Sequence, residues 1–268
     1  MNIQQNLSQL FYIKNDPNRL RNEPHSFVKK LDSFNLNGNS IQDTVCNQYF
    51  IHPLVTADTR FSLTTIYPGL ILGAGYSHPA LHKVDTTKKN DLSDFQLGFF
   101  FDHTTGLPVI PGSSVKGVLK SVFPKKDFPF KEEKLEYIRS LLPDEKRQLI
   151  DFINWQKIFF ERKLVFLDAY IAEIPPDGKI LEDDNITPHT AGIFKNPIPI
   201  RFLKVAPGVT FTFQFLLKNY MKSDLHKLTA SKEDEVVLSV HDIKEVFKNI
   251  LIDFGIGAKR NVGYGQLK

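Results

Sequence analysis

The stretch VTFTFQFLL, residues 209–217, gives the clearest secondary-structure signal in this sequence. Threonine and phenylalanine alternate strictly from Thr210 to Phe213, and such alternation is typical of a strand with one buried face. Aromatic and β-branched side chains also suit the pleated surface of a sheet. We therefore predict a half-buried strand over this segment.

Three more segments are predicted to be strands on the same grounds. The clearest of them is TRFSLTTIY, residues 59–67, where Phe61, Leu63 and Thr65 alternate with polar neighbours. The other two are FQLGFFF, residues 95–101, and KLVFLDAYIAEI, residues 163–174, in which Val165, Leu167, Ala169 and Ile171 form one face. The stretch from Pro175 to Ile200 is rich in Pro, Gly, Asp and Asn, and we expect it to be a long loop.

Two segments carry a helical period. In PGSSVKGVLKSVF, residues 111–123, Ser113 or Ser114 is the expected N-cap and Pro124 ends the helix. Its apolar positions are Val115, Val118, Leu119 and Val122. The segment SVHDIKEVFKNILIDFGIG, residues 239–257, is predicted to be amphipathic and to end at its glycines. Its apolar positions are Ile243, Val246, Phe247, Ile250 and Leu251.

Two further regions are predicted to be largely helical. The first fifty or so residues combine helical and connecting segments. Residues 131–160 are rich in Glu, Lys, Leu and Ile, with Pro143 between two expected helices. We expect this acidic block to be an insertion on the solvated side of a sheet-forming core.

Length and composition favour a folded, cytoplasmic protein. The chain has 268 residues, 41% of them hydrophobic, which is enough to fill a core. Cys46 is the single cysteine, so it cannot form an internal disulfide, and we expect it to be a buried apolar residue. The start MNIQQNLSQLF lacks the pattern of a signal peptide, and no apolar run is long enough to span a membrane.

Charge is unevenly distributed along the chain. The windows 59–84, 103–126, 185–223 and 254–268 contain no acidic residue but hold 14 of the 34 Lys and Arg residues. The rest of the chain has 20 basic residues and all 30 acidic ones, so the net charge of +4 hides a strong segregation. Such segregation favours a surface that faces a polyanion.

The tail GIGAKRNVGYG, residues 255–265, is the first candidate for that surface. Glycines permit positive φ and let a nucleic-acid strand approach closely, while a basic loop tip supplies charge for phosphates. The plainer alternative is a helix C-cap followed by a tight turn. A dinucleotide fingerprint is excluded, because Arg260 stands where the third glycine would be. The candidate RNA-binding residues of the tail are Gly255, Gly257, Lys259, Arg260, Asn261, Gly263 and Gly265.

The start of the helix at 111–123 is the second candidate. Ser113 and Ser114 bring hydroxyls and amides to a helix N-terminus, where a phosphate is favoured. Lys116 and Lys120 lie four residues apart and could follow the same RNA backbone. Ordinary capping with two solvated lysines is an equal alternative.

Metal binding and catalysis have weaker signals. His78 and His82 have helical metal spacing, but Pro79 lies between them and no further ligand is near, so we expect no metal and no cofactor. The pairs Asp102-His103 and Asp183-Asp184 are more typical of turns and caps than of acid–base pairs. His189 either contacts RNA or stabilises its loop.

Four segments together resemble the RAMP superfamily of CRISPR-associated proteins. The motifs follow in order, and the resemblance covers roughly Phe95 to the C-terminus. Within the superfamily they resemble most closely the sixth subunit of the Cmr complex, the type III-B RNA-guided effector. A pattern that ends in Asp-x-x-Thr-Pro-His is matched by Asp184, Thr187, Pro188 and His189. The segments are PGSSVKGVLKSVF (111–123), LVFLDAYIAEIPPDGKILEDDNITPH (164–189), NPIPIRFLKVAPGVTFTFQFLL (196–217) and FGIGAKRNVGYGQL (254–267).

The resemblance implies an α+β fold: a modified ferredoxin-like, RRM-type core in one RAMP domain covering 1–268. It implies a loosely matched region at 1–58 and a helical insertion at about 127–162. It also implies a non-catalytic subunit that holds guide (CRISPR) RNA near its 3′ end, supports target RNA binding and contacts other Cmr subunits in antiviral defence. Target cleavage in such complexes belongs to another subunit, so no catalytic residue is carried over.

Two alternatives remain open from the sequence. One is a RAMP endoribonuclease that processes guide precursor RNA, with His52, His103 or His189 as general base. The other is an interaction protein whose basic face binds an acidic protein.

Overall fold

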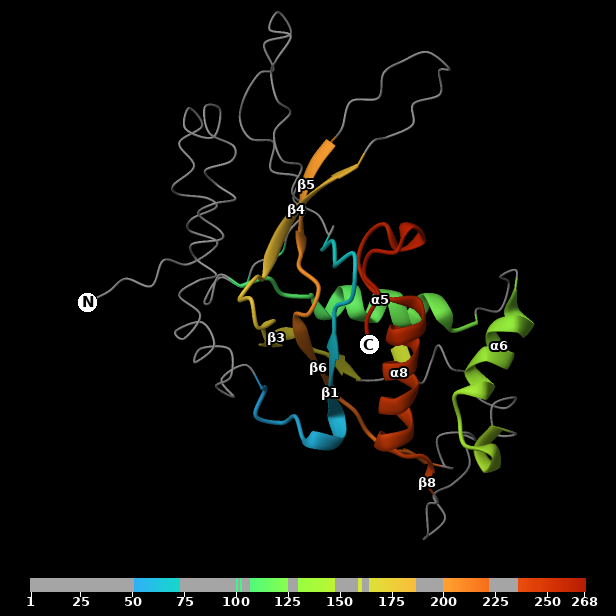
Figure 1. Cartoon of the computed structure of the whole chain (residues 1–268). Helices are drawn as coiled ribbons and strands as arrows, with labels where there is room; N and C mark the ends of the chain where they lie inside the picture. The colour runs from blue at the N-terminus through green and yellow to red at the C-terminus, as the bar shows by residue number, and fades with distance from the viewer. Residues whose placement is uncertain are drawn as a thin grey trace, which may run out of the picture.

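One antiparallel sheet forms the centre of the computed structural model (Figure 1). Strand β6 (Thr210–Leu216) pairs with β1 (Arg60–Thr64) on one side and with β2 (Val165–Phe166) and β3 (Tyr170–Glu173) on the other. Helices α5 (Gly112–Val122) and α8 (Val240–Phe254) pack on this sheet. The structure describes residues 51–72, 100, 102, 107–124, 130–147, 159–160, 164–186, 200–221 and 236–268.

The other elements are shorter or lie at the margins of this core. They are the 3-10 helix η2 (Ala57–Thr59), α6 (Lys131–Ser140), β4 (Leu181–Ile186), β5 (Ile200–Val205), β7 (Tyr220–Met221), β8 (Val236–Leu238) and the 3-10 helix η5 (Arg260–Val262). All described strand pairs are antiparallel, and the mixture of sheet and helix confirms the α+β class.

The alternation in β6 separates the two faces of the sheet, as the sequence predicted. Phe211, Phe213 and Phe215 are at most 1% exposed and point into the core. On the other face, hydroxyl groups form cross-strand hydrogen bonds, with 2.8 Å between Ser62 and Thr212. The strand prediction for residues 59–67 is confirmed over β1, whose residues pair with β6 in regular register.

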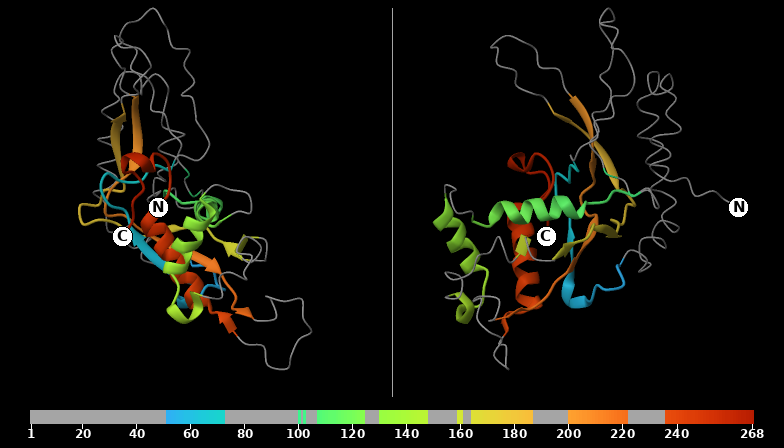
Figure 2. Two further views of the ribbon diagram at one scale, coloured as in Figure 1. Left: turned by 90° about the vertical axis from the view of Figure 1, so that its right-hand side faces the viewer. Right: turned by 180° about the vertical axis from the view of Figure 1, so that it is seen from behind.

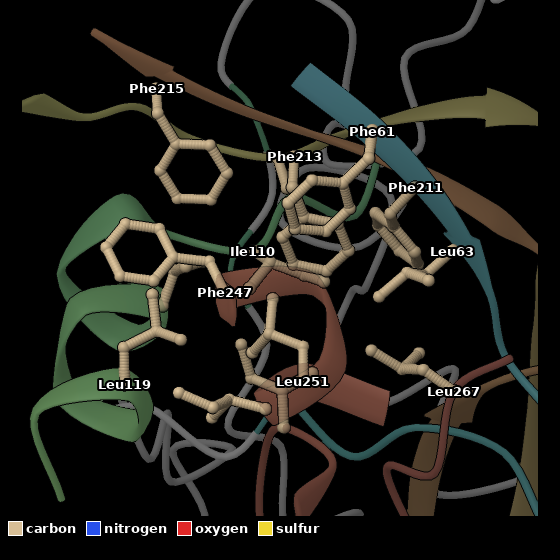
Figure 3. Close-up of a cluster of buried hydrophobic side chains, with 14 of the residues drawn as sticks. Phe61, Leu63, Ile110, Leu119, Phe211, Phe213, Phe215, Phe247, Leu251 and Leu267 are labelled. Carbon is tan, nitrogen blue, oxygen red and sulfur yellow. The ribbon is translucent and has the colours of Figure 1, made fainter. Parts of the chain in front are cut away.

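The apolar face of the sheet is covered by α5 and α8, and aromatic rings fill the space between them (Figure 3). The ring of Phe247 on α8 lies 5.4 Å from that of Phe215 and 5.8 Å from that of Phe166, measured between centroids. Burial of so many phenylalanines is the main stabilising contribution to this fold.

Helix α8 matches its prediction closely. Ser239 is the N-cap and accepts a hydrogen bond from the Asp242 N–H, while the Asp242 carboxylate accepts from Ser239 in return. Gly255 ends the helix with φ of 63°. Its five predicted core positions, Ile243, Val246, Phe247, Ile250 and Leu251, are all buried.

Helix α5 begins earlier than predicted, and the expected serine N-cap is wrong. Pro111 occupies the N-cap position, so Ser113 and Ser114 lie within the first turn. The first amide is capped from elsewhere in the fold, because the Gly112 N–H donates to Asp168 Oδ1 across 2.7 Å. A Cβ at Gly112 would collide with the Phe166 carbonyl, so only glycine lets the helix start approach β2 this closely.

The strand predicted at 163–174 is split into β2 and β3. Phe166 pairs with Phe215, and Tyr170 pairs with Thr212. The chain advances four residues from Phe166 to Tyr170, whereas β6 advances only three residues between their partners. The extra residue is a bulge, and it places Asp168 beside α5. The predicted inward position of Val165 is also wrong, since that side chain is 42% exposed.

The long loop predicted from Pro175 to Ile200 is wrong in part. Residues Leu181–Ile186 form β4, which pairs along its whole length with β5. Acidic residues in LEDDNI hid this strand, because a two-stranded hairpin that projects from the core needs little apolar alternation (Figure 2).

The block at 131–160 is not wholly on the solvated side. Residues Ile138, Leu142, Phe159 and Phe160 are buried in the core, whereas Glu132 and Glu133 are exposed. Pro143 does follow the helix α6, as predicted. The Lys146 ammonium lies 2.6 Å from the Asp242 carboxylate and ties the block to α8.

Several predictions fall outside the described residues. They concern residues 1–50 with Cys46, all of residues 95–101 except Phe100, and His78, His82, His103 and His189. In the part of the chain that is described, no helix has the length and apolar character needed to cross a membrane.

Candidate nucleic-acid interface

The tail after α8 is a closed loop held by backbone hydrogen bonds. The Ile256 N–H donates to the Gly265 carbonyl across 2.9 Å, which joins the two ends of the loop. Between them, Lys259 has φ of 56° and Gly263 has φ of 96°, on either side of the 3-10 turn η5. The loop therefore has one defined backbone path.

Packing within the chain explains the glycines of the tail. A Cβ on Gly255 would lie 2.5 Å from the Gly265 carbonyl oxygen, and one on Gly257 would collide with the Ile71 carbonyl. A Cβ on Gly265 would collide with the Ile256 carbonyl. Gly263 has room for a side chain but keeps a positive φ. The fold thus requires these glycines whether or not RNA approaches them.

The basic tip of the loop is more informative about binding. Lys259 and Asn261 are exposed, and nothing acidic follows Asp253 in the sequence. Arg260 is half-buried, and its Nη1 donates to the Phe254 carbonyl across 3.2 Å at the end of α8. Arg260 therefore stabilises the helix terminus as well as contributing charge.

An open groove of about 350 Å³ lies between the tail and α5. The red tail loop lies beside the green helix in Figures 1 and 2. The groove brings together both regions that the sequence singled out, because Ser114 and Arg260 both line it. From α5 the lining residues are Ser114, Gly117, Val118 and Ser121, and from the tail they are Ile256, Gly257, Ala258 and Arg260.

Lys116 does not face this groove. A helix turns about 100° per residue, so Lys116 lies about 200° around the axis from Ser114. Its ammonium is placed over the Phe166 ring, 5.7 Å from the centroid. Lys120 and Ser113 are exposed but do not line the groove either.

The N-terminus of α5 already has an anionic partner. The Asp168 carboxylate accepts from the Gly112 N–H, and the Ser114 and Val115 N–H groups donate to the Pro111 carbonyl. These contacts satisfy amides that a phosphate would otherwise use. The groove side of α5 is consequently a better candidate surface than its first turn.

A polar cluster that the sequence did not predict fixes the tail to the β4–β5 hairpin. The Tyr264 hydroxyl donates to Asp184 Oδ2 across 2.8 Å, and the Lys204 ammonium lies 2.9 Å from the same oxygen. Lys204 is only 6% exposed and also lies 3.6 Å from the Glu182 carboxylate. Asp184 stands 20 residues from Lys204 and 80 from Tyr264, so no local pattern could have revealed the cluster.

The cluster shifts the pKa of its members in opposite directions. Burial, the hydrogen bond to Asp184 and the charge of that carboxylate raise the pKa of Tyr264 to about 12. Burial alone would raise the pKa of Asp184, but hydrogen bonds from Lys204, Tyr264 and the Asn185 backbone lower it overall. Tyr264 is therefore a neutral donor and Asp184 a charged acceptor at neutral pH, as a structural tie requires.

The remaining candidate residues form no reactive cluster in the described part of the chain. No group of three or more His, Cys, Asp or Glu side chains there could hold a metal ion. His52 is exposed, its backbone N–H donates to Gln214 Oε1, and its Nδ1 accepts from the Leu54 N–H across 3.2 Å.

Residues 62–268 match the family model of the RAMP superfamily. The chain belongs to the RAMP superfamily. This RAMP protein is 28% identical over 174 residues to the CRISPR system CMR subunit Cmr6 of Saccharolobus solfataricus. The match covers 63% of the chain and 48% of the relative, so the chain spans about half of that protein.

Solved structures with similarity to this RAMP protein include a Cmr complex and an isolated Cmr6. A type III-B Cmr-beta complex bound to cognate target RNA contains a chain that is 24% identical, with a TM-score of 0.46, covering 78% of this chain and 57% of that one. The crystal structure of Cmr6 from Pyrococcus furiosus is 23% identical, with a TM-score of 0.40, covering 78% and 95%.

Proposed function

We propose that this RAMP protein is a non-catalytic RNA-binding subunit of a type III-B Cmr effector complex. In this role it holds guide RNA near its 3′ end and supports the binding of target RNA in antiviral defence. The similarity to a protein named Cmr6 supports the choice of complex. The position along the guide rests on the family resemblance of the sequence motifs.

The observation that carries the RNA-binding part is the junction of the basic tail with the α5 groove. Lys259 is exposed at the tip, Arg260 lines the groove, and both lie on a segment without acidic residues. Phosphate contacts hold a strand without reading its sequence, which suits a subunit whose guide supplies specificity by base pairing.

The same geometry suggests which residues contact the strand. We assign Ser114 on α5 and Lys259, Arg260 and Asn261 on the tail to the RNA path. Lys116 and Lys120 lie on other sides of α5 and would contact RNA only outside the groove. Four residues of the tail shape the loop and are not assigned an RNA contact of their own: Gly255, Gly257, Gly263 and Gly265. His189 is included in the proposal only because it belongs to the sequence motif.

The proposal is tested by measuring the affinity of the full chain for single-stranded RNA across a range of salt concentrations. Two or three phosphate contacts should give a slope of about −1.4 to −2.1 in a plot of log affinity against log salt. Co-purification with Cmr subunits and with guide RNA should accompany this behaviour. Failure to bind RNA at low salt, or binding without salt dependence, would contradict the proposal.

The endoribonuclease alternative has its own test. Its described candidate base, His52, has Nδ1 engaged with the Leu54 backbone and lies outside the groove. Incubation of the full chain with repeat RNA in the absence of metal should leave the RNA intact. Cleavage at a defined position, lost in His52→Ala, His103→Ala or His189→Ala, would overturn the non-catalytic assignment.

A further inference from the structure

A turn from a distant part of the sequence lies against the tail. The Gly265 N–H donates to the Gly69 carbonyl across 2.8 Å, and the Ala258 N–H donates to the Ile71 carbonyl across 2.9 Å. The Ile66 N–H donates to the Gln266 carbonyl across 3.2 Å. Residues 66–71 and the tail therefore form one continuous surface.

This turn is rigidly held by its backbone. The Gly69 N–H closes the turn on the Ile66 carbonyl across 2.8 Å. Gly69 has φ of 113°, and a Cβ there would collide with the Val205 carbonyl of β5. The backbone that carries residue 67 is consequently fixed on both sides, by the tail and by the hairpin.

The side chain on this rigid turn points outward. Tyr67 is 83% exposed, the highest value among the exposed large apolar and aromatic residues of the described chain. Val262, at the tip of the tail, is 65% exposed. The two are linked through their neighbours, since Pro68 Cδ lies 3.6 Å from the position of a Cβ on Gly263.

The turn that carries Tyr67 is joined to the strand that holds Lys204 of the polar cluster. The Leu70 N–H donates to the Val205 carbonyl of β5 across 3.0 Å, and Lys204 is the residue before Val205. The two carboxylates of the cluster, Asp184 and Glu182, share the Lys204 ammonium, which offsets part of their repulsion toward an anion. The tail that is hydrogen-bonded to this turn carries Lys259 and Arg260 at its tip.

We propose that Tyr67 is a stacking platform for an unpaired base of the bound RNA. The inference rests on the proposed function and names a contact outside the glycine-rich tail. An exposed aromatic ring on a turn that is hydrogen-bonded to a basic tail suits single-stranded nucleic acids, because every base has a π-face that can stack on the ring and the tail supplies charge for phosphates. Val262 adds a second exposed apolar side chain on the tail. The cations and the acid-free tail favour RNA over an acidic or apolar protein segment as the occupant.

The experiment compares two ligands of equal length, an oligoadenylate and an abasic ribose-phosphate strand. The full chain, Tyr67→Phe and Tyr67→Ala are each titrated with both ligands at one salt concentration. Tyr67→Ala should bind oligoadenylate about 5- to 150-fold more weakly than the unsubstituted chain, the range expected for loss of one stacked base. It should bind the abasic strand unchanged, and Tyr67→Phe should bind both normally.

Controls separate stacking from folding and from the wider proposal. Phe130→Ala removes another aromatic side chain, 69% exposed at the N-cap of α6, and should leave the affinity for oligoadenylate unchanged. Thermal unfolding of Tyr67→Ala should match that of the unsubstituted chain, because the ring is exposed. Equal binding of oligoadenylate by Tyr67→Ala and the unsubstituted chain would overturn the stacking role and leave RNA binding standing. Loss of complex assembly with normal RNA binding would reassign Tyr67 to a protein contact, and no binding of either ligand by any variant would overturn both proposals.

Discussion

The carboxylate of Asp168 caps the first amide of α5, with 2.7 Å between Oδ1 and the Gly112 nitrogen. The bulge between β2 and β3 sets this contact, and Pro111 at the N-cap has no side-chain acceptor of its own. A helix that forms one wall of the groove therefore depends on a residue 56 positions away.

We predict that Asp168→Ala lowers the free energy of unfolding by about 1 kcal/mol, the usual value of an N-cap side chain. Asp168→Asn keeps an acceptor oxygen and should recover most of this loss. Denaturant unfolding monitored by circular dichroism measures both. Equal stability of all three proteins would show that the capping contact contributes nothing.

Asp184 should make stability depend on pH in the acid range. Its pKa is lower in the folded chain than the unfolded value of about 3.9, so its contribution is present above that value and is lost as pH falls through the folded pKa. The stability difference between the unsubstituted chain and Asp184→Asn should therefore shrink as pH is lowered below about 4. Asp144→Asn, at an exposed ion pair with Arg147, is the control for loss of a surface carboxylate and should change the free energy of unfolding at neutral pH by at most about 1 kcal/mol.

Two glycines of the tail should differ in their tolerance of alanine. Gly263→Ala should be destabilised only by the positive φ at that position, which lowers the free energy of unfolding by about 1–2 kcal/mol. Gly257→Ala has the same conformational cost and adds the collision with the Ile71 carbonyl, so it should be the less stable variant. Thermal unfolding of the pair decides the order, and equal melting temperatures would contradict the packing described for Gly257.

Gly117 offers a test of the groove itself. A Cβ at this position meets nothing within 4 Å, and the residue lies inside α5 facing the groove. Gly117→Ala should raise stability by about 1 kcal/mol, the difference in helix propensity. If RNA occupies the groove, affinity should fall from Gly117→Ala to Gly117→Leu while the fold is retained. Constant affinity across this series would place the RNA elsewhere.

The basic tip should account for part of the salt dependence. Lys259→Ala combined with Arg260→Ala should weaken RNA binding and reduce the magnitude of the salt slope by about 1.4, which corresponds to two phosphate contacts. Lys259→Ala alone is the cleaner variant, because Arg260 also donates to the Phe254 carbonyl. Lys131→Ala on α6 is the matched charge control. An unchanged slope in the double variant would contradict the assignment.

Regular elements with a strong apolar period were predictable from the sequence. The five core positions of α8 and the alternating phenylalanines of β6 are buried as expected, because burial of one face imposes that period on the chain. The end of α8 at Gly255 was also predictable, since a positive φ there favours glycine.

Local sequence was a poor guide where distant residues meet. The strand β4 is acidic and is stabilised by its pairing with β5, so its own residues carry no strand period. Lys116 and Lys120 were predicted to share one RNA-binding face, but neither lines the groove, and Lys116 lies over Phe166. Which face of α5 lines the groove depends on the segments that pack against the helix.

The glycine-rich tail shows most directly what the sequence determined and what the tertiary structure decided. Its sequence alone determined that a basic, glycine-rich segment without acidic residues follows an amphipathic helix. Only the tertiary structure decided that the glycines are required by the carbonyls of Ile71, Ile256 and Gly265, because steric contacts between segments are not encoded in local composition. It likewise decided that Tyr264 is tied to Asp184 and that the tail faces α5 across a groove, since those distances follow from how the whole chain packs.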